Sequence, residues 1–162
     1  MKLGVSSTWS CAMPMPSLLI YLILVSSFSS ITNACFFTPT WKLYIINSTP
    51  DNIITHVRSK DDDLGKHVVP SKGYYYWSFC DRFDRTTRFN ADFWWGEKYQ
   101  CLEVFAKLAR RKCDRFGSGV QSCFWQVRSD GFYISALNIS FPDPLWTLVK
   151  TWGSNDILCN TI

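Results

Sequence analysis

The sequence predicts an all-β fold, a small antiparallel β-sandwich of about eight strands that disulfides stabilise. Three observations support this class. Aromatic residues make up 17% of the chain and there are only eight glycines, a composition that suits half-buried pleated sheets. Short alternating or β-branched segments recur along the chain, with turn signals between them. An even number of cysteines remains once the N-terminal segment described next is removed.

The first 34 residues have the features of a secretory signal peptide. Lys2 is their only charged residue, and an apolar run extends from Leu18 to Val25. Thr32-Asn33-Ala34 then provides small residues at the −3 and −1 positions of a cleavage site. The apolar run is shorter than the roughly 20 residues of a membrane span. We therefore expect residues 1–34 to be removed and the chain to be secreted into the extracellular space; a retained N-terminal anchor is the alternative.

The cysteines predict a disulfide framework in the mature chain. Of the seven in the sequence, Cys11 leaves with the signal peptide. The six that remain are Cys35, Cys80, Cys101, Cys113, Cys123 and Cys159. An even count in a small exported chain predicts disulfides, whose connectivity the spacing alone leaves open. The chain has no Cys-x-x-Cys pair and no histidine pair at zinc-finger spacing, so neither a zinc site nor a redox-active thiol pair is predicted.

The mature chain is predicted to be one domain with a weak positive charge. Removal of 34 residues leaves 128 of the 162, enough for a single core. The net charge of +4 falls to +3 with the loss of Lys2, and the basic residues are scattered apart from Arg110-Arg111-Lys112. A nucleic-acid footprint needs a denser basic stripe, so no nucleic-acid partner is expected. A weak association with acidic cell walls or membrane surfaces is compatible with this charge.

The first half of the domain contains four expected strands, in chain order. Alternating or β-prone runs occupy 41–45, 53–58, 67–69 and 74–79. The connections at 47–52, 59–65 and 70–73 are rich in Asn, Asp, Ser, Pro and Gly, which favour turns and loops. The first half therefore predicts four short strands joined by turns and loops.

The second half adds the remaining expected strands. Residues 88–95 alternate with a period of two, and 99–105 follow after a Gly96-Glu97 turn. The clearest hairpin spans 125–134, where Asp130-Gly131 supplies the positive φ angles of a tight turn. Residues 104–111 have some helical character, and we expect them to fray into a basic loop.

The pattern weakens after Ala136, which sets the predicted domain boundary. Residues 35–140 are assigned to the sandwich domain and 141–162 to a C-terminal tail. Phe141-Pro142-Asp143-Pro144 interrupts the alternation at the start of this tail. The tail is either an extra strand that Cys159 ties down or a loose segment.

No residue pattern points to catalysis, so the chain is predicted not to be an enzyme and to need no metal or cofactor. Asp61-Asp62-Asp63 lacks the alternate ligand spacing and terminal glutamate of a calcium loop, and is interpreted as a solvated turn. His56 and His67 could act as acid and base in a secreted hydrolase. They lie in predicted strands with no nucleophile or oxyanion site nearby, so a structural role is favoured for both.

Two further patterns concern binding and modification. The aromatic clusters at 74–77 and at Trp94-Trp95 belong either to the sandwich core or to a stacking platform for sugars or lipids. Asn47 and Asn138 begin glycosylation sequons, the first of which is followed by Pro50. Both asparagines are therefore predicted acceptors in an exported chain.

Several of these segments together resemble the plant self-incompatibility protein S1 family, the S-protein homologues. The string from 56 to 65, His-Val-Arg-Ser-Lys-Asp-Asp-Asp-Leu-Gly, is the most specific of them, and the likeness covers about residues 41–135. The residues that carry it are His56, Ser59, Asp61, Asp62, Asp63, Leu64 and Gly65, with Trp125, Asp130 and Gly131 downstream. The resemblance implies a secreted β-sandwich without enzymatic activity.

The resemblance also implies a disulfide arrangement. The family usually has cysteines where this chain has Val57 and Ala91, and these two cysteines are expected to bridge. Cys113 with Cys123 matches the family's second bridge. The extra Cys80 and Cys101 are a hypothetical replacement for the missing bridge between neighbouring strands, and Cys35 with Cys159 is then the remaining pair.

The expected function is that of a secreted signalling ligand recognised by a plasma-membrane receptor protein. The best understood family members are pistil ligands that meet a pollen membrane protein, whereas most others have no assigned role. Specificity is expected in the polar loops at 59–66, 81–85 and 107–119. Candidate contact residues are Lys60, Lys66, Asp81, Arg85, Arg110 and Arg111. The alternative is a defence module that binds lipids or glycans through the aromatic clusters.

Overall fold

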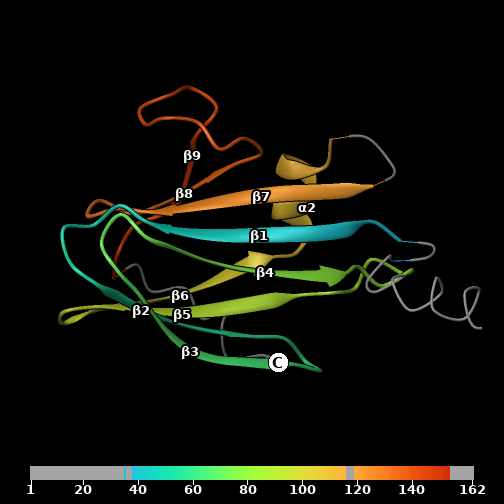
Figure 1. Ribbon diagram of the computed structural model, residues 1–162, viewed down its shortest axis with the longest axis horizontal. Coiled ribbons are helices and arrows are strands. Elements are labelled where there is room, and N and C mark those ends of the chain that lie inside the picture. Colours follow the sequence, from blue (N-terminus) through green and yellow to red (C-terminus); the bar gives the residue numbers. More distant parts are fainter. Residues whose placement is uncertain (1–34, 36–37, 116–118, 154–162) are drawn as a thin grey trace, which may run out of the picture. The chain divides into compact units, whose positions relative to one another are not determined.

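Two β-sheets packed face to face make up the domain (Figure 1). The computed structural model describes residues 35, 38–115 and 119–153. Within this part of the chain the strands are β1 (Thr40–Asn47), β2 (Ile53–Arg58), β3 (Asp63–Val69), β4 (Tyr74–Cys80), β5 (Phe89–Trp95), β6 (Lys98–Phe105), β7 (Val120–Val127), β8 (Phe132–Ser135) and β9 (Thr147–Lys150), with one helix, α2 (Lys107–Cys113). None of these residues form a helix with the length and apolar character needed to cross a membrane.

The strand order confirms the predicted all-β sandwich. One sheet has five strands in the order β4-β1-β7-β8-β9, and the other has four in the order β3-β2-β5-β6. One pairing differs from a wholly antiparallel sandwich, because β1 and β7 run parallel along their full length. An alternating pattern shows which side chains face the core, but it does not distinguish a parallel from an antiparallel neighbour.

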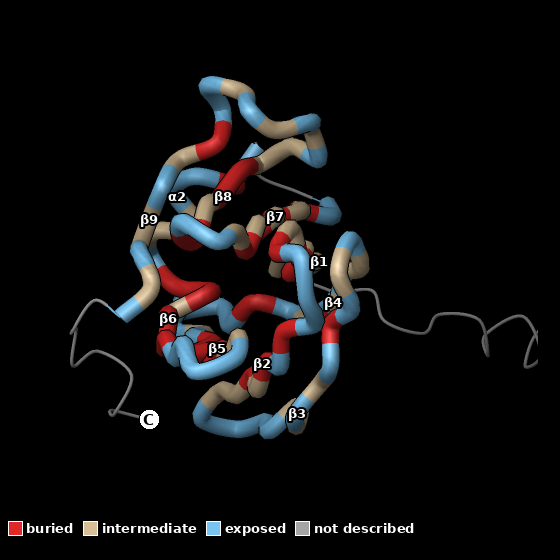
Figure 2. The backbone as a smooth tube through the Cα atoms, turned by 90° about the vertical axis from the view of Figure 1, so that its left-hand side faces the viewer, coloured by how far each residue is buried: buried red, intermediate tan, exposed pale blue. Residues whose placement is uncertain are grey.

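The core lies between the sheets, where buried segments of both sheets face each other (Figure 2). In β1 every second residue is buried, and its Trp41 ring meets Phe105 edge-on with the ring centroids 4.9 Å apart. Trp125 on β7 is fully buried and donates its indole N–H to the Val104 carbonyl oxygen at 2.9 Å. This bond links the five-stranded sheet to β6 of the other sheet. The large aromatic fraction of the sequence is thus used chiefly in packing.

Several predicted boundaries differ in the structure. β3 begins at Asp63, four residues earlier than expected, because Asp63 pairs with Arg58 beyond a register shift that leaves one extra residue in β3. β6 includes Val104 and Phe105, so the helix begins only at Lys107. The helix does not fray into a loop, because its apolar side is buried against the core.

Part of the predicted C-terminal tail belongs to the five-stranded sheet. Strand β9 pairs antiparallel with β8, which corresponds to the extra-strand alternative. Trp152 then packs on Phe132 with ring centroids 4.6 Å apart and donates its indole N–H to the Arg128 carbonyl oxygen at 2.7 Å. Cys159 and the predicted signal peptide lie outside the described residues.

The glycine of the β7–β8 turn approaches β9 closely. Gly131 has a φ of +154°, and a Cβ atom there would lie 2.5 Å from the Lys150 carbonyl oxygen. We expect Gly131→Ala to lower the free energy of unfolding by about 2 kcal/mol, because β9 must move away from the turn. Urea unfolding measures this loss. Gly96→Ala, at a positive φ with open space around the new methyl group, isolates the backbone contribution. Equal losses in the two variants would contradict a steric role for β9.

The disulfides agree with one predicted pair and contradict two. Cys113 is bonded to Cys123, as the family resemblance implied. Cys35 is bonded to Cys80, so the predicted pairs Cys80–Cys101 and Cys35–Cys159 are wrong. Cys80 ends β4 at an edge of the five-stranded sheet, opposite Thr40, whereas Cys101 lies on β6 in the other sheet, where it is itself disulfide-bonded.

The two positions at which the resemblance implied a further bridge in relatives meet in the core. Val57 on β2 pairs directly with Ala91 on β5, and both are fully buried. Apolar packing therefore occupies the place of the cross-strand disulfide that the resemblance implied.

Only one of the two sequons presents its asparagine at the surface. Asn47 is fully buried, and its Nδ2 donates to the carbonyl oxygens of Asp51 and Val69 at 2.8 and 2.9 Å. Its Oδ1 accepts from the backbone and the hydroxyl of Thr49. A glycan on Nδ2 would replace one of these bonded hydrogens inside the fold, so this burial argues against the predicted glycosylation of Asn47 in the folded protein. Asn138 is exposed and stays a predicted acceptor.

Candidate functional site

The family motif builds the turn between β2 and β3. Ser59 closes it, because its backbone N–H donates to the Asp62 carbonyl oxygen at 2.7 Å and its Oγ accepts from the backbone of Asp61 and Asp62. Asp63 then accepts the Gly65 N–H at 2.8 Å and lies 2.6 Å from His56 Nε2. The acidic run is therefore a hydrogen-bonded turn, as expected, and His56 has a structural role in it.

Hydrogen bonding makes Asp63 a stronger acid than usual. The Gly65 backbone N–H, followed by the His56 side chain, lowers the pKa of the Asp63 carboxyl from its ordinary value of 3.8. The folded state is thereby favoured above pH 3.8, and this contribution is lost as the pH falls through the lowered pKa.

We expect the turn to open in acid for this reason. Unfolding stability should fall more steeply between roughly pH 5 and pH 2 in the native protein than in Asp63→Asn. The Gly65 amide signal in NMR spectra would report the turn directly. Asp62→Asn is the matched control, since that carboxylate accepts none of the bonds of the turn. An identical acid profile for the native protein and Asp63→Asn would contradict the assignment.

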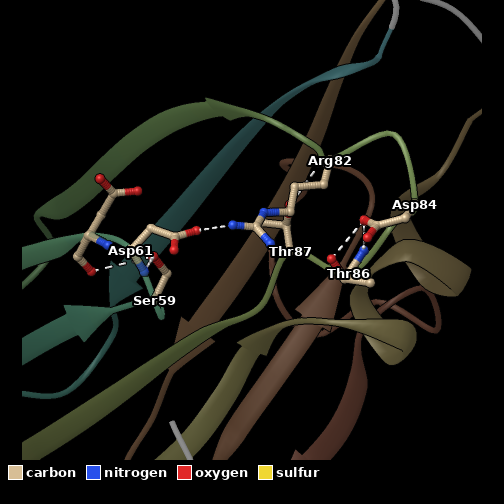
Figure 3. Close-up of polar contacts among 7 residues, drawn as sticks. Ser59, Asp61, Arg82, Asp84, Thr86 and Thr87 are labelled. Carbon is tan, nitrogen blue, oxygen red and sulfur yellow. Dashed lines mark hydrogen bonds and ion pairs between the residues drawn. The ribbon is translucent and has the colours of Figure 1, made fainter.

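The loop between β4 and β5, residues 81–88, is held in shape and tied to this turn (Figure 3). The Arg82 N–H donates to Thr87 Oγ1 at 2.9 Å, and Asp84 accepts from both the backbone and the hydroxyl of Thr86. The Arg82 guanidinium forms an ion pair with Asp61, 21 residues earlier. Two segments far apart in the sequence therefore act as one surface.

Helix α2 anchors the same loop from the other side. The Arg110 guanidinium donates to both carboxylate oxygens of Asp81, at 2.8 and 2.9 Å, and to the Thr87 carbonyl oxygen at 2.6 Å. The two side chains are only 12% and 2% exposed, and Arg110 also lies over the Phe105 ring. The three predicted recognition loops thus meet at one end of the sandwich, but Asp81 and Arg110 are used internally rather than offered to a partner.

A groove of about 530 Å³ lies between the β2–β3 turn and the β4–β5 loop. Phe79 and Phe89 give it an apolar part, and Lys60, Asp62, Arg88 and Thr86 add charge and hydrogen-bonding groups. We call this the loop groove. Neither histidine lines it, and the described residues contain no group of three side chains that could hold a metal ion. Its lining therefore offers apolar contact and hydrogen-bonding groups of both charge signs.

The other candidate residues lie in different places. Arg85 is exposed in the β4–β5 loop, with its guanidinium 4.0 Å from Asp114, and Arg111 is exposed on α2. Lys66 is outside the loop groove, over the Trp94 ring on the outer face of the four-stranded sheet. Asp130 and Gly131 are at the opposite end of β7, so the family motif does not form a single site.

Sequence reasoning missed several groove residues. Phe79, Thr86, Arg88 and Phe89 were assigned to strands or to connections rather than to a site, whereas Arg82 lies in the predicted 81–85 recognition loop. The one available signal was the composition of residues 82–88, Arg-Phe-Asp-Arg-Thr-Thr-Arg, because arginine and aromatic residues are enriched in protein interfaces.

The fold and the loop groove define a class of protein: a small, disulfide-linked β-sandwich whose loops form a groove at one end. Comparison with known sequences then gives the family, because the plant self-incompatibility protein S1 family matches residues 42–152. The chain belongs to this family.

Individual relatives support the assignment. Self-incompatibility protein S1 from Papaver rhoeas is 32% identical over 117 residues, which covers 71% of this chain and 81% of the relative. S-protein homolog 5 from Arabidopsis thaliana is 30% identical over 100 residues, or 57% of this chain and 71% of the relative.

A solved structure shares the fold. It matches with a TM-score of 0.53 and 18% identity, and covers 72% of this chain and 97% of the solved one. It represents the self-incompatibility protein homologues, described as a widespread family of small, highly stable, secreted proteins from plants. The predicted secretion agrees with that description.

Proposed function

We propose that this protein is a secreted signalling ligand that binds a plasma-membrane receptor protein through the loop groove and the adjoining β4–β5 loop. The observation that carries the proposal is the exposed side chain of Phe83, 88% accessible, beside three arginines in the same short loop. Aromatic and arginine side chains supply most of the binding energy in protein interfaces.

Preorganisation supports the same surface. The Arg82–Asp61 and Arg110–Asp81 ion pairs hold the loop before any partner arrives. A partner therefore loses little free energy in ordering these residues. The groove carries both signs of charge, which suits a folded protein surface better than a uniformly charged polymer.

The alternative, a module that binds lipids or glycans through the aromatic clusters, has less support. A sugar platform needs free ring faces, yet Tyr44 stacks on Tyr76 at 5.5 Å and on Phe124 at 4.8 Å. The Trp94 face lies under Lys66, and the Trp95 face under Lys98. The faces of these rings already contact other side chains of the protein, which leaves less ring surface for a sugar.

Binding to cells tests the function. The secreted chain, purified from the medium of plant cells that express the full sequence, is labelled and added to protoplasts from several tissues before and after surface proteolysis. A receptor ligand binds saturably, and proteolysis abolishes the binding. Binding that survives proteolysis, or that never saturates, would contradict a protein receptor and indicate that the protein recognises lipids or the cell wall.

Phe83 provides the sharper test of the surface. Because its ring has few contacts within the protein, we expect Phe83→Ala to weaken cell binding by roughly 10- to 100-fold while the melting temperature stays unchanged. Leu145→Ala, at a side chain 58% exposed in another loop, is the control and should bind normally. Equal binding by both variants would show that the receptor contacts a different face.

A further inference from the structure

The four edge strands of the two sheets are not equally protected against pairing with another strand. Exposed edges invite pairing, and proteins usually block them with charges, prolines, bulges or short length. Among the described residues β4 pairs only with β1, so its other edge is open. β4 has seven residues, Tyr-Tyr-Tyr-Trp-Ser-Phe-Cys, with no charge, no proline and an unbroken register.

Each of the other three edges carries at least one protective feature. β3 contains Asp63 and Lys66 and the positive-φ Gly65. β6 contains Lys98 and Glu103 and ends in a register shift. β9 has only four residues, includes Lys150 and also pairs through a register shift. The open edge of β4 is therefore a specific feature and not a general property of this sandwich.

We infer that two copies of this protein pair antiparallel along β4 and so form a continuous ten-stranded sheet. A twofold axis beside Trp77 would set Tyr76 of one copy opposite Ser78 of the other. Self-pairing brings identical strands together, which like charges would oppose, and β4 has none. Tyr74 and Tyr76, 62% and 54% exposed next to this edge, would gain neighbours across it.

The dimer has a consequence that goes beyond the proposed receptor binding. The loop groove begins at the end of β4, since Phe79 and Cys80 line it. Antiparallel pairing would place the two grooves at opposite ends of the joined strands, separated by about the length of a seven-residue strand, roughly 23 Å. Such a dimer is a bivalent ligand, which gains avidity for receptors clustered in a membrane.

Sedimentation equilibrium of the purified secreted chain over a wide concentration range tests the dimer. Tyr76→Lys/Ser78→Lys places like charges opposite each other across the proposed axis, and the protein should become a monomer. Ser122→Lys/Phe124→Lys is the matched control, because Ser78 and Ser122 flank Lys42 on the same face and Tyr76 and Phe124 both flank Tyr44. The control should keep the dimer, because β7 is an interior strand.

Three outcomes would overturn the inference: a native protein that stays monomeric throughout, a dimer that persists in the β4 variant, or a dimer that both variants abolish. Hydrogen exchange provides a second test of the dimer. It is measured on the native protein, so its result does not depend on whether the variants fold. Amides of β4 should gain protection as concentration rises, and those of β3 and β6 should not. The dimer is tested without any receptor, so its failure leaves the receptor proposal standing.

Discussion

Asp81→Ala is expected to lower the free energy of unfolding by about 3–5 kcal/mol. The substitution leaves the Arg110 guanidinium, only 12% exposed, without its bidentate partner. A charge that is buried and unpaired costs far more than the original pair contributes. The Thr87 carbonyl oxygen cannot compensate, since it accepts only one of the guanidinium's hydrogens. Urea or guanidinium unfolding measures the loss.

Two comparisons isolate the ion pair. Asp81→Ala/Arg110→Met removes both charges and should recover much of the lost stability. Glu103→Ala breaks the exposed contact with Arg88, whose atoms lie 3.9 Å apart, and should cost about 0–1 kcal/mol. If Asp81→Ala cost no more than Glu103→Ala, the buried pair would not be what holds α2 to the β4–β5 loop.

Trp125→Ala is expected to cost about 3–5 kcal/mol, the range for removal of a buried large aromatic side chain. The indole of Trp125 is fully buried, and its N–H bonds to the Val104 carbonyl oxygen in the opposite sheet. The variant therefore loses apolar burial, creates a cavity and leaves a buried carbonyl group unsatisfied.

A second substitution separates packing from hydrogen bonding. Trp125→Phe keeps most of the apolar volume but removes the donor, and should cost about 1–3 kcal/mol. Trp94→Ala, on the half-exposed outer face under Lys66, is the control and should cost less than either. A loss in Trp125→Ala that is no larger than in Trp94→Ala would mean that the core does not depend on the inter-sheet contact.

Local patterns predicted much of the fold because they record which side chains face the core. The alternation in β1, β2 and β5 located these strands to within one or two residues, and the Asp130-Gly131 turn located the β7–β8 hairpin. The family string predicted the turn at Ser59. The Cys113–Cys123 pair, only ten residues apart, followed from the same family likeness.

The candidate site could not be predicted from local patterns, because contacts between residues far apart in the sequence form it. The Asp61–Arg82 and Asp81–Arg110 ion pairs join residues 21 and 29 positions apart, and no local period marks them. Their existence depends on which loops the two sheets bring to the same end. Asp81 and Arg110 therefore looked like surface contacts, although the fold buries them.

Composition, periodicity and one short motif were enough to predict the secretion, the all-β class, the family and most strand positions. The parallel β1–β7 pair, the Cys35–Cys80 disulfide, the burial of Asn47 and the loop groove became apparent only in the folded structure. Each of these depends on which strands become neighbours. That choice is made by the joint packing of both sheets, where free energy is summed over contacts between residues far apart in the chain.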